Sequence, residues 1–228
     1  MLPDIRVVED DVLRWRGDVV ALKYADAWHG ADRAVSERLK EAGRMAPGAF
    51  PDGDAPLWIA SEGALPSAHV VFVPLPPLHR LGYADLRWFT QAALTEIGRR
   101  QPGTRTIALT LHGPGFGLDE REALRAEIAG VLDALRDGGA PPGLASVTFV
   151  ERRRQRAERL ARILRESAGA DRPIANDVVR DGDATRDVPV DPLPIAVSGD
   201  PLIGASVIGE LFGPLSPRGA EGEPDTPR

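Results

Sequence analysis

Short apolar runs alternate with stretches of helical periodicity along residues 1–167. Runs of apolar and β-branched residues bounded by charges, Gly or Pro predict strands at 5–8, 19–22, 57–60, 69–75, 106–111 and 147–150. Apolar positions three and four residues apart predict helices at 31–42, 86–97, 119–135 and 152–164. Such alternation is typical of layered α/β folds with a parallel or mixed sheet. We therefore predict one α/β domain over residues 1–167.

The pattern stops at about residue 168. Pro, Gly and Asp dominate 168–228, and neither helical nor alternating periodicity continues, which predicts a largely disordered C-terminal tail. One apolar segment, residues 201–215 (PLIGASVIGELFGPL), interrupts it. This segment is too short to span a bilayer, which takes about 20 residues. It is expected to dock either on its own domain or on a protein partner.

Composition and charge narrow the classes of function. The chain has no Cys, which excludes disulfides, Cys-based zinc sites and thiol catalysis. The net charge is −6, and residues 171–228 hold 11 acidic and 5 basic residues, so the domain before them is neutral. A neutral domain makes nucleic acid an unexpected partner. The N-terminus lacks an apolar signal region and no apolar run is long enough for a membrane span, so we expect a cytoplasmic protein.

A glycine-rich loop is the main candidate for ligand binding. Its residues Gly113, Pro114, Gly115, Phe116 and Gly117 lie between a predicted buried strand and a predicted helix. Free backbone N–H groups there, at the carboxyl end of a strand, favour an anion such as a diphosphate. The alternative is an ordinary turn, because the acidic residues 119–122 already suit the positive end of the following helix.

Several segments, in this order, resemble the macro domain, an ADP-ribose-binding α/β/α fold. They are residues 5–13 (IRVVEDDVL), 17–21 (GDVVA), 30–35 (GADRAV), 63–74 (GALPSAHVVFVP) and 107–117 (IALTLHGPGFG). The resemblance covers roughly residues 5–165 and implies a three-layer α/β/α domain with a mixed central sheet. The N-terminal domain of leucine aminopeptidases is similar to this fold and is a related possibility.

The resemblance also implies a set of ligand-binding residues. It assigns Asp11 a hydrogen bond from the adenine amino group; an ordinary turn aspartate is the alternative. It assigns Gly30, Ala31 and Asp32 to the loop that faces residues 113–117. The asparagines that hold the distal ribose in the hydrolases of the family fall on Leu22 and Ala25 here. Neither side chain can orient a hydroxyl or a water, so we expect binding without hydrolysis, no catalytic residue and no bound cofactor or metal.

Three further features leave alternatives open. Asp26, His29 and Asp32 are close enough in sequence for a metal site, but solvated loop residues explain them as well. His112 could contact a phosphate or act as an acid or base, or it could be a histidine at the end of a strand. The last helix carries a row of arginines that could face water, an acidic tail or partner, or, least expected, nucleic acid.

These features give three hypotheses. The first is non-hydrolytic binding of ADP-ribose or a related nucleotide derivative. The second is an adaptor with a degenerate pocket, which recruits a protein through the tail or residues 201–215; by resemblance alone, it would serve bacterial signalling or defence. The third is a hydrolase with a non-standard site that includes His112. The sequence fixes neither the ligand, the partner nor the oligomeric state.

Overall fold

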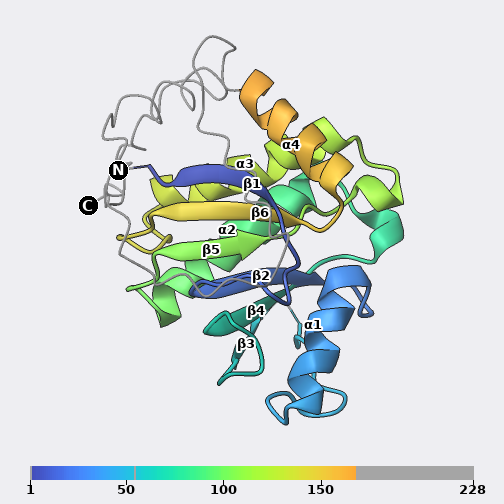
Figure 1. The fold of residues 1–228 in the computed structure, drawn as a ribbon, viewed down its shortest axis with the longest axis vertical. Coiled ribbons are helices and arrows are strands. Elements are labelled where there is room, and N and C mark those ends of the chain that lie inside the picture. The colour runs from blue at the N-terminus through green and yellow to red at the C-terminus, as the bar shows by residue number, and fades with distance from the viewer. Residues whose placement is uncertain (1, 54, 168–228) are drawn as a thin grey trace, which may run out of the picture.

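A computed structural model describes residues 2–53 and 55–167. The predicted tail and its apolar segment 201–215 lie outside the described residues. The elements, labelled in Figure 1, are β1 (Asp4–Glu9), β2 (Val19–Tyr24), α1 (Gly30–Glu41), β3 (Leu57–Ala60), β4 (His69–Pro74), η1 (Leu78–Arg80), α2 (Tyr83–Arg100), β5 (Thr106–Leu109), η2 (Pro114–Phe116), α3 (Glu120–Arg136), β6 (Ser146–Glu151) and α4 (Arg154–Ser167). No helix in this part of the chain is long and apolar enough to cross a membrane.

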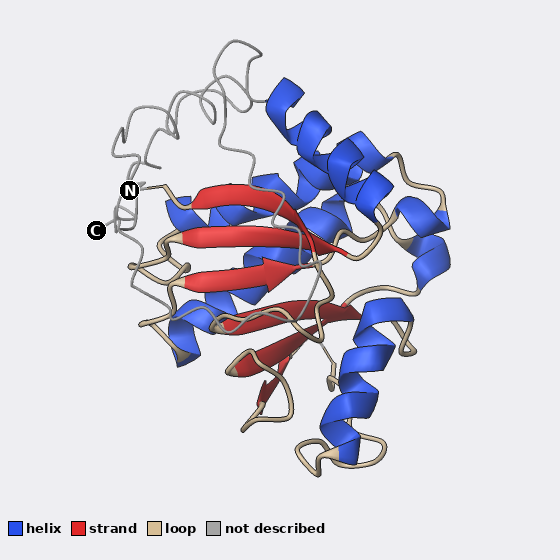
Figure 2. Ribbon diagram, viewed as in Figure 1, coloured by secondary structure: helices blue, strands red, loops and turns tan. Residues whose placement is uncertain are grey.

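The six strands form one mixed sheet in the order β1-β6-β5-β2-β4-β3. All neighbouring pairs are parallel except β3 with β4 (Figure 2). The carboxyl ends of the five parallel strands therefore meet at one edge of the sheet. The loops that follow β1, β2, β5 and β6 all start from that edge, where open α/β sheets place their ligands.

Helices cover both faces of the sheet, which confirms the predicted three layers (Figure 1). Alternate residues of β2 enter two separate apolar cores. Val19 and Ala21 pack in the core beneath α2, α3 and α4, whereas Val20 and Leu22 pack in the core beneath α1. Helix α1 is thus the only described helix on its face, and its first turn stands beside the loop that follows β5.

Strand β5 is shorter than its apolar sequence suggests. We predict a strand over 106–111, but β5 ends at Leu109. Beyond it the backbone N–H of His112 donates to the Glu127 carboxylate (2.9 Å) instead of to a neighbouring strand. This side-chain acceptor on α3 turns the chain out of the sheet and brings the glycine loop to the open edge.

Candidate functional site

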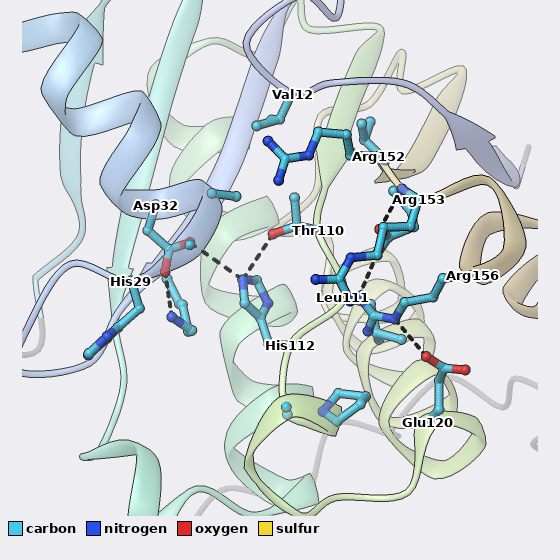
Figure 3. Close-up of a pocket in the computed structure, with 18 of the residues that line it drawn as sticks. Val12, His29, Asp32, Thr110, Leu111, His112, Glu120, Arg152, Arg153 and Arg156 are labelled. Atoms are coloured by element: carbon cyan, nitrogen blue, oxygen red, sulfur yellow. Dashed lines mark hydrogen bonds and ion pairs between the residues drawn. The ribbon is translucent and has the colours of Figure 1, made fainter.

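A cleft of about 850 Å³ opens at the carboxyl edge of the sheet. Its walls are the turn after β1, the start of α1, the loop after β5 and the start of α4 (Figure 3). Every residue predicted to bind a ligand lines it, except Gly117: Asp11, Gly30, Ala31, Asp32, Gly113, Pro114, Gly115 and Phe116. The structure therefore brings together residues that lie up to about a hundred positions apart in the sequence.

The start of α1 supplies free backbone donors to this cleft. His29 occupies the N-cap position, and its side chain makes no capping hydrogen bond. The first bonded amide of the turn is that of Asp32, which donates to the His29 carbonyl (3.1 Å). The N–H groups of Gly30 and Ala31 therefore have no acceptor within the described residues, and they stand at the positive end of the helix.

The glycine loop faces them across the cleft. It is closed by one short turn, in which the Phe116 amide donates to the Gly113 carbonyl (2.8 Å). Gly113 has φ +93°, and a Cβ there would lie 2.7 Å from Leu118, so the turn requires glycine. The amides of Gly113, Gly115 and Gly117 have no acceptor in the described part of the chain. Two turns with free donors thus flank one cavity, as an anion site needs.

Aromatic side chains do not close the cleft. Phe116 is 50% exposed and stands at the rim, where its ring lies 6.4 Å from that of His29. Trp28 turns away from the cavity and packs edge-on against Phe72, 4.8 Å between ring centroids. Tyr24 stacks on Phe50 and does not line the cleft either. The free amides therefore remain open to a ligand.

The start of α3 is not part of this donor set. Asp119 caps it, because its Oδ1 accepts from the amides of Arg121 (2.9 Å) and Glu122 (3.0 Å). The Glu120 carboxylate forms ion pairs with Arg156 and Arg159 of α4. Partial burial alone would raise the pKa of Glu120, but these two arginines lower it below its ordinary value. Asp119 and Glu120 still line the cleft, but the Asp119 carboxylate caps α3 and that of Glu120 is paired with two arginines.

A buried polar network forms the floor of the cleft (Figure 3). Lys23 pairs with Asp32, and both side chains are almost fully buried. His112 lies between Asp32 (Nε2 to Oδ1, 3.8 Å) and Glu127 (Nδ1 to Oε1, 3.1 Å). The Thr110 hydroxyl lies 3.1 Å from His112 Nε2. The carboxylate of Asp32 thus contacts Lys23 and His112 in this network, although Asp32 also lines the cleft.

The network shifts the pKa of His112. Burial acts to lower the pKa of His112, but the charge of Glu127 and the hydrogen bond with Asp32 outweigh it and raise this pKa above 6.5. Burial raises the pKa of Glu127 as well. Its second oxygen, Oε2, is buried without a hydrogen-bond partner in the described residues. Both shifts favour the protonated form of the group concerned.

Asp11 lies at the opposite end of the cleft, in the turn after β1. Its Oδ1 accepts from the Leu13 amide (3.0 Å), as a turn aspartate does. Its Oδ2 has no hydrogen-bond partner among the described residues. One carboxylate oxygen is thus committed to the turn, and the other is available to a ligand.

The fold of this chain is similar to that of known proteins. No family model and no curated protein matches the sequence. Among solved structures, the Oceanobacillus iheyensis macrodomain with MES bound has a TM-score of 0.51 at 15% identity, over 69% of this chain and 87% of that one. The Trypanosoma brucei macrodomain in complex with ADP-ribose has a TM-score of 0.54 at 15% identity, over 69% and 67%. Its complex with ADP also has a TM-score of 0.54, at 13% identity, over 70% and 68%.

The chain has a macrodomain-like fold. The two positions onto which the ribose-binding asparagines of the family fall are buried in this macrodomain-like chain. Leu22 is fully buried in the α1-side core, and Ala25 is 2% exposed. Neither lines the cleft. The macrodomain-like cleft therefore lacks an amide at this place.

Several cleft residues escaped the sequence analysis. Thr110 lies inside the predicted strand 106–111 and Glu127 inside the predicted helix 119–135, whereas Lys23 directly follows the predicted strand 19–22 and belongs to β2. Lys23 offered one signal, because it is one of only two lysines and sits in an otherwise apolar strand. For Arg152 and Arg153 the sequence left water, an acidic tail or partner, and nucleic acid open, and the structure shows that both line the cleft.

The possible metal site did not assemble. The Asp32 carboxylate is turned to Lys23, while Asp26 and His29 are exposed. No group of three or more His, Asp or Glu in the described residues could hold a metal ion.

Proposed function

We propose that this chain binds ADP-ribose or a related nucleotide derivative in the cleft, without hydrolysing it. The observation that carries this proposal is the meeting of two turns with free backbone donors, at Gly30–Ala31 and at Gly113–Gly117. A diphosphate offers acceptor oxygens on both sides and suits such a pair of turns. The fold is shared with macrodomains, one of which is described in complex with ADP-ribose and with ADP.

The cleft also suggests an orientation for this ligand. The free Oδ2 of Asp11 could accept from an adenine amino group at the β1 end. The diphosphate would then lie over the amides of Gly30 and Gly115, and the distal ribose would lie above the floor. Leu22 and Ala25 offer no amide to that ribose or to an attacking water, which supports binding without hydrolysis.

The variant Gly115→Glu tests the proposal. Gly115 is exposed and no atom lies within 4 Å of a Cβ built there, so the fold should tolerate the new side chain. A carboxylate beside the diphosphate costs several kcal/mol, which weakens binding about a hundredfold or more. Isothermal titration calorimetry with ADP-ribose, ATP and NAD measures this loss.

Gly103→Glu is the matched control. Gly103 is also exposed with no atom within 4 Å of its Cβ position, and it does not line the cleft. This variant should bind as the wild type does. Undiminished affinity of Gly115→Glu for a ligand that binds the wild type contradicts the proposed site, and the absence of binding to all three ligands contradicts the function.

A second candidate function, hydrolysis through a non-standard site, is favoured by one arrangement on the floor. Thr110, His112 and Glu127 form a hydroxyl–imidazole–carboxylate chain, with 3.1 Å at each step. Such an order activates a hydroxyl as nucleophile in many hydrolases. Here the activation requires neutral His112, and the raised pKa of His112 confines it to higher pH. Release of ADP-ribose from an ADP-ribosyl ester, lost in Thr110→Val, would establish it. No release by the wild type would leave binding as the function.

The remaining hypotheses stay predictions. The adaptor hypothesis relies on residues 201–215 and on the acidic tail, which lie outside the described residues. A role in bacterial signalling or defence, a cytoplasmic location and a similarity to leucine aminopeptidases are predictions of the same kind.

A further inference from the structure

Four arginines form one wall of the cleft. They are Arg152, Arg153, Arg156 and Arg159, at the end of β6 and in the first turns of α4. The charges of Arg156 and Arg159 are neutralised by ion pairs. Arg156 pairs with Glu120 (2.7 Å) and Glu151, and Arg159 pairs with Glu120. These pairs pin α4 to the start of α3.

The other two arginines are free of such partners. Neither Arg152 nor Arg153 forms an ion pair with a described residue, and both are exposed. Their side chains extend from the α4 side into the cleft, with Arg152 beside Val12 (Figure 3). Glu151, the nearest carboxylate in sequence, is already engaged, because it accepts from the Arg153 amide (2.8 Å) and from Arg156. Two unpaired guanidinium groups therefore share one side of the cavity.

Sheet register places this pair at a defined end of the cleft. Strands β1 and β6 are neighbours, with Glu9 opposite Glu151, and the Asp10 amide donates to the Glu151 carbonyl (3.2 Å). Arg152 thus follows β6 directly beside the turn that holds Asp11. The free donors of Gly30 and Gly113 lie on the other walls. The arginine pair is therefore separate from the amides proposed to hold the diphosphate.

We propose that Arg152 and Arg153 form a subsite for a second anionic group, a phosphomonoester on the adenosine side of the ligand. This inference rests on the proposed function, since that function places the adenosine at Asp11. Guanidinium groups bind phosphate through paired, charge-assisted hydrogen bonds. An arginine near the ribose is also the feature by which dinucleotide sites accept a 2′-phosphate. The ligand class is an adenine nucleotide derivative with a separate phosphate on the adenosine ribose.

Calorimetry of the full chain with ADP-ribose and with its 2′-phosphate and 3′-phosphate derivatives tests the subsite. One of the two phosphorylated ligands should bind about tenfold tighter than ADP-ribose, as expected for a charge-assisted contact at a partly exposed site. The double variant Arg152→Gln, Arg153→Gln should lose this preference, so that it binds ADP-ribose and the two phosphorylated derivatives with equal affinity. Arg154→Gln is the control, because Arg154 pairs with Glu158 and does not line the cleft.

The outcomes separate the subsite from the proposed function. If all three ligands bind equally, the subsite is overturned and ADP-ribose binding stands; the arginines then face water or the acidic residues after 170. If the preference persists in the double variant, the assignment to Arg152 and Arg153 is wrong. If no ligand binds, both proposals fall.

Discussion

At the scale of single residues, His112 shows how the fold shifts the pKa of a side chain. It lies between Glu127 and Asp32 and is excluded from water, and Lys23 holds Asp32 from the other side. The sequence suggested His112 as a candidate but could not supply its partners, because the members of the network come from β2, α1, the loop after β5 and α3. The periodicity of apolar residues predicts which positions are buried, but it does not predict which buried polar groups contact each other.

The network predicts that stability falls as the pH rises. The folded chain raises the pKa of His112 above 6.5, so the stabilisation is present below that pH and is lost as the pH passes the folded-state pKa. The raised pKa of Glu127 acts in the same direction. Urea unfolding should give a lower free energy of unfolding at about pH 9 than at about pH 6. Each tenfold difference in proton affinity between the folded and unfolded states contributes about 1.4 kcal/mol to this loss.

The variant His112→Gln should flatten this pH dependence. The exposed residue His79 supplies the control, since His79→Gln should keep the wild-type profile. A wild-type free energy of unfolding that rises between these two pH values would contradict the raised pKa of His112.

At the scale of elements, α2 and α3 pack closely against each other. The two helices touch at Gly130, where a Cβ would lie 2.1 Å from the Arg87 carbonyl oxygen. Arg87 also donates to Asp133 (Nη2 to Oδ1, 2.9 Å) across the same contact. The sequence predicted both helices, although α2 extends beyond 86–97 to Tyr83–Arg100. The sequence could not predict their contact, because a glycine inside a helical pattern indicates only a less stable helix.

Gly130→Ala tests this close approach. In an exposed helix the change would stabilise by up to about 1 kcal/mol, because glycine is a poor helix former. Here overpacking should instead lower the free energy of unfolding by about 1–3 kcal/mol. Gly103→Ala, with open space at its Cβ position, should change it little. Chemical denaturation measures both, and a stabilised Gly130→Ala variant would show that the helices do not touch there.

At the scale of the whole molecule, the order of the strands creates the site. Alternating strands and helices predicted a layered α/β fold with a parallel or mixed sheet, and the macro-domain resemblance implied three layers with a mixed sheet. The alternation did not predict which strands are neighbours. Because β6 lies between β1 and β5, Arg152 comes beside the turn of Asp11, although about 140 residues separate them. The sequence therefore indicated the glycine loop and its facing turn, whose residues are local, and missed the arginine wall, which depends on sheet order.

The central claim is that the free amides of the two turns bind one anionic ligand. Titration of the ¹⁵N-labelled chain with ADP-ribose, followed by amide chemical shifts, observes these groups directly. The largest shifts should fall on Gly30, Ala31, Gly113 and Gly115, which line the cleft, while Gly103 stays unchanged. Saturable shifts confined to residues outside the cleft, or no shifts at all, would contradict it.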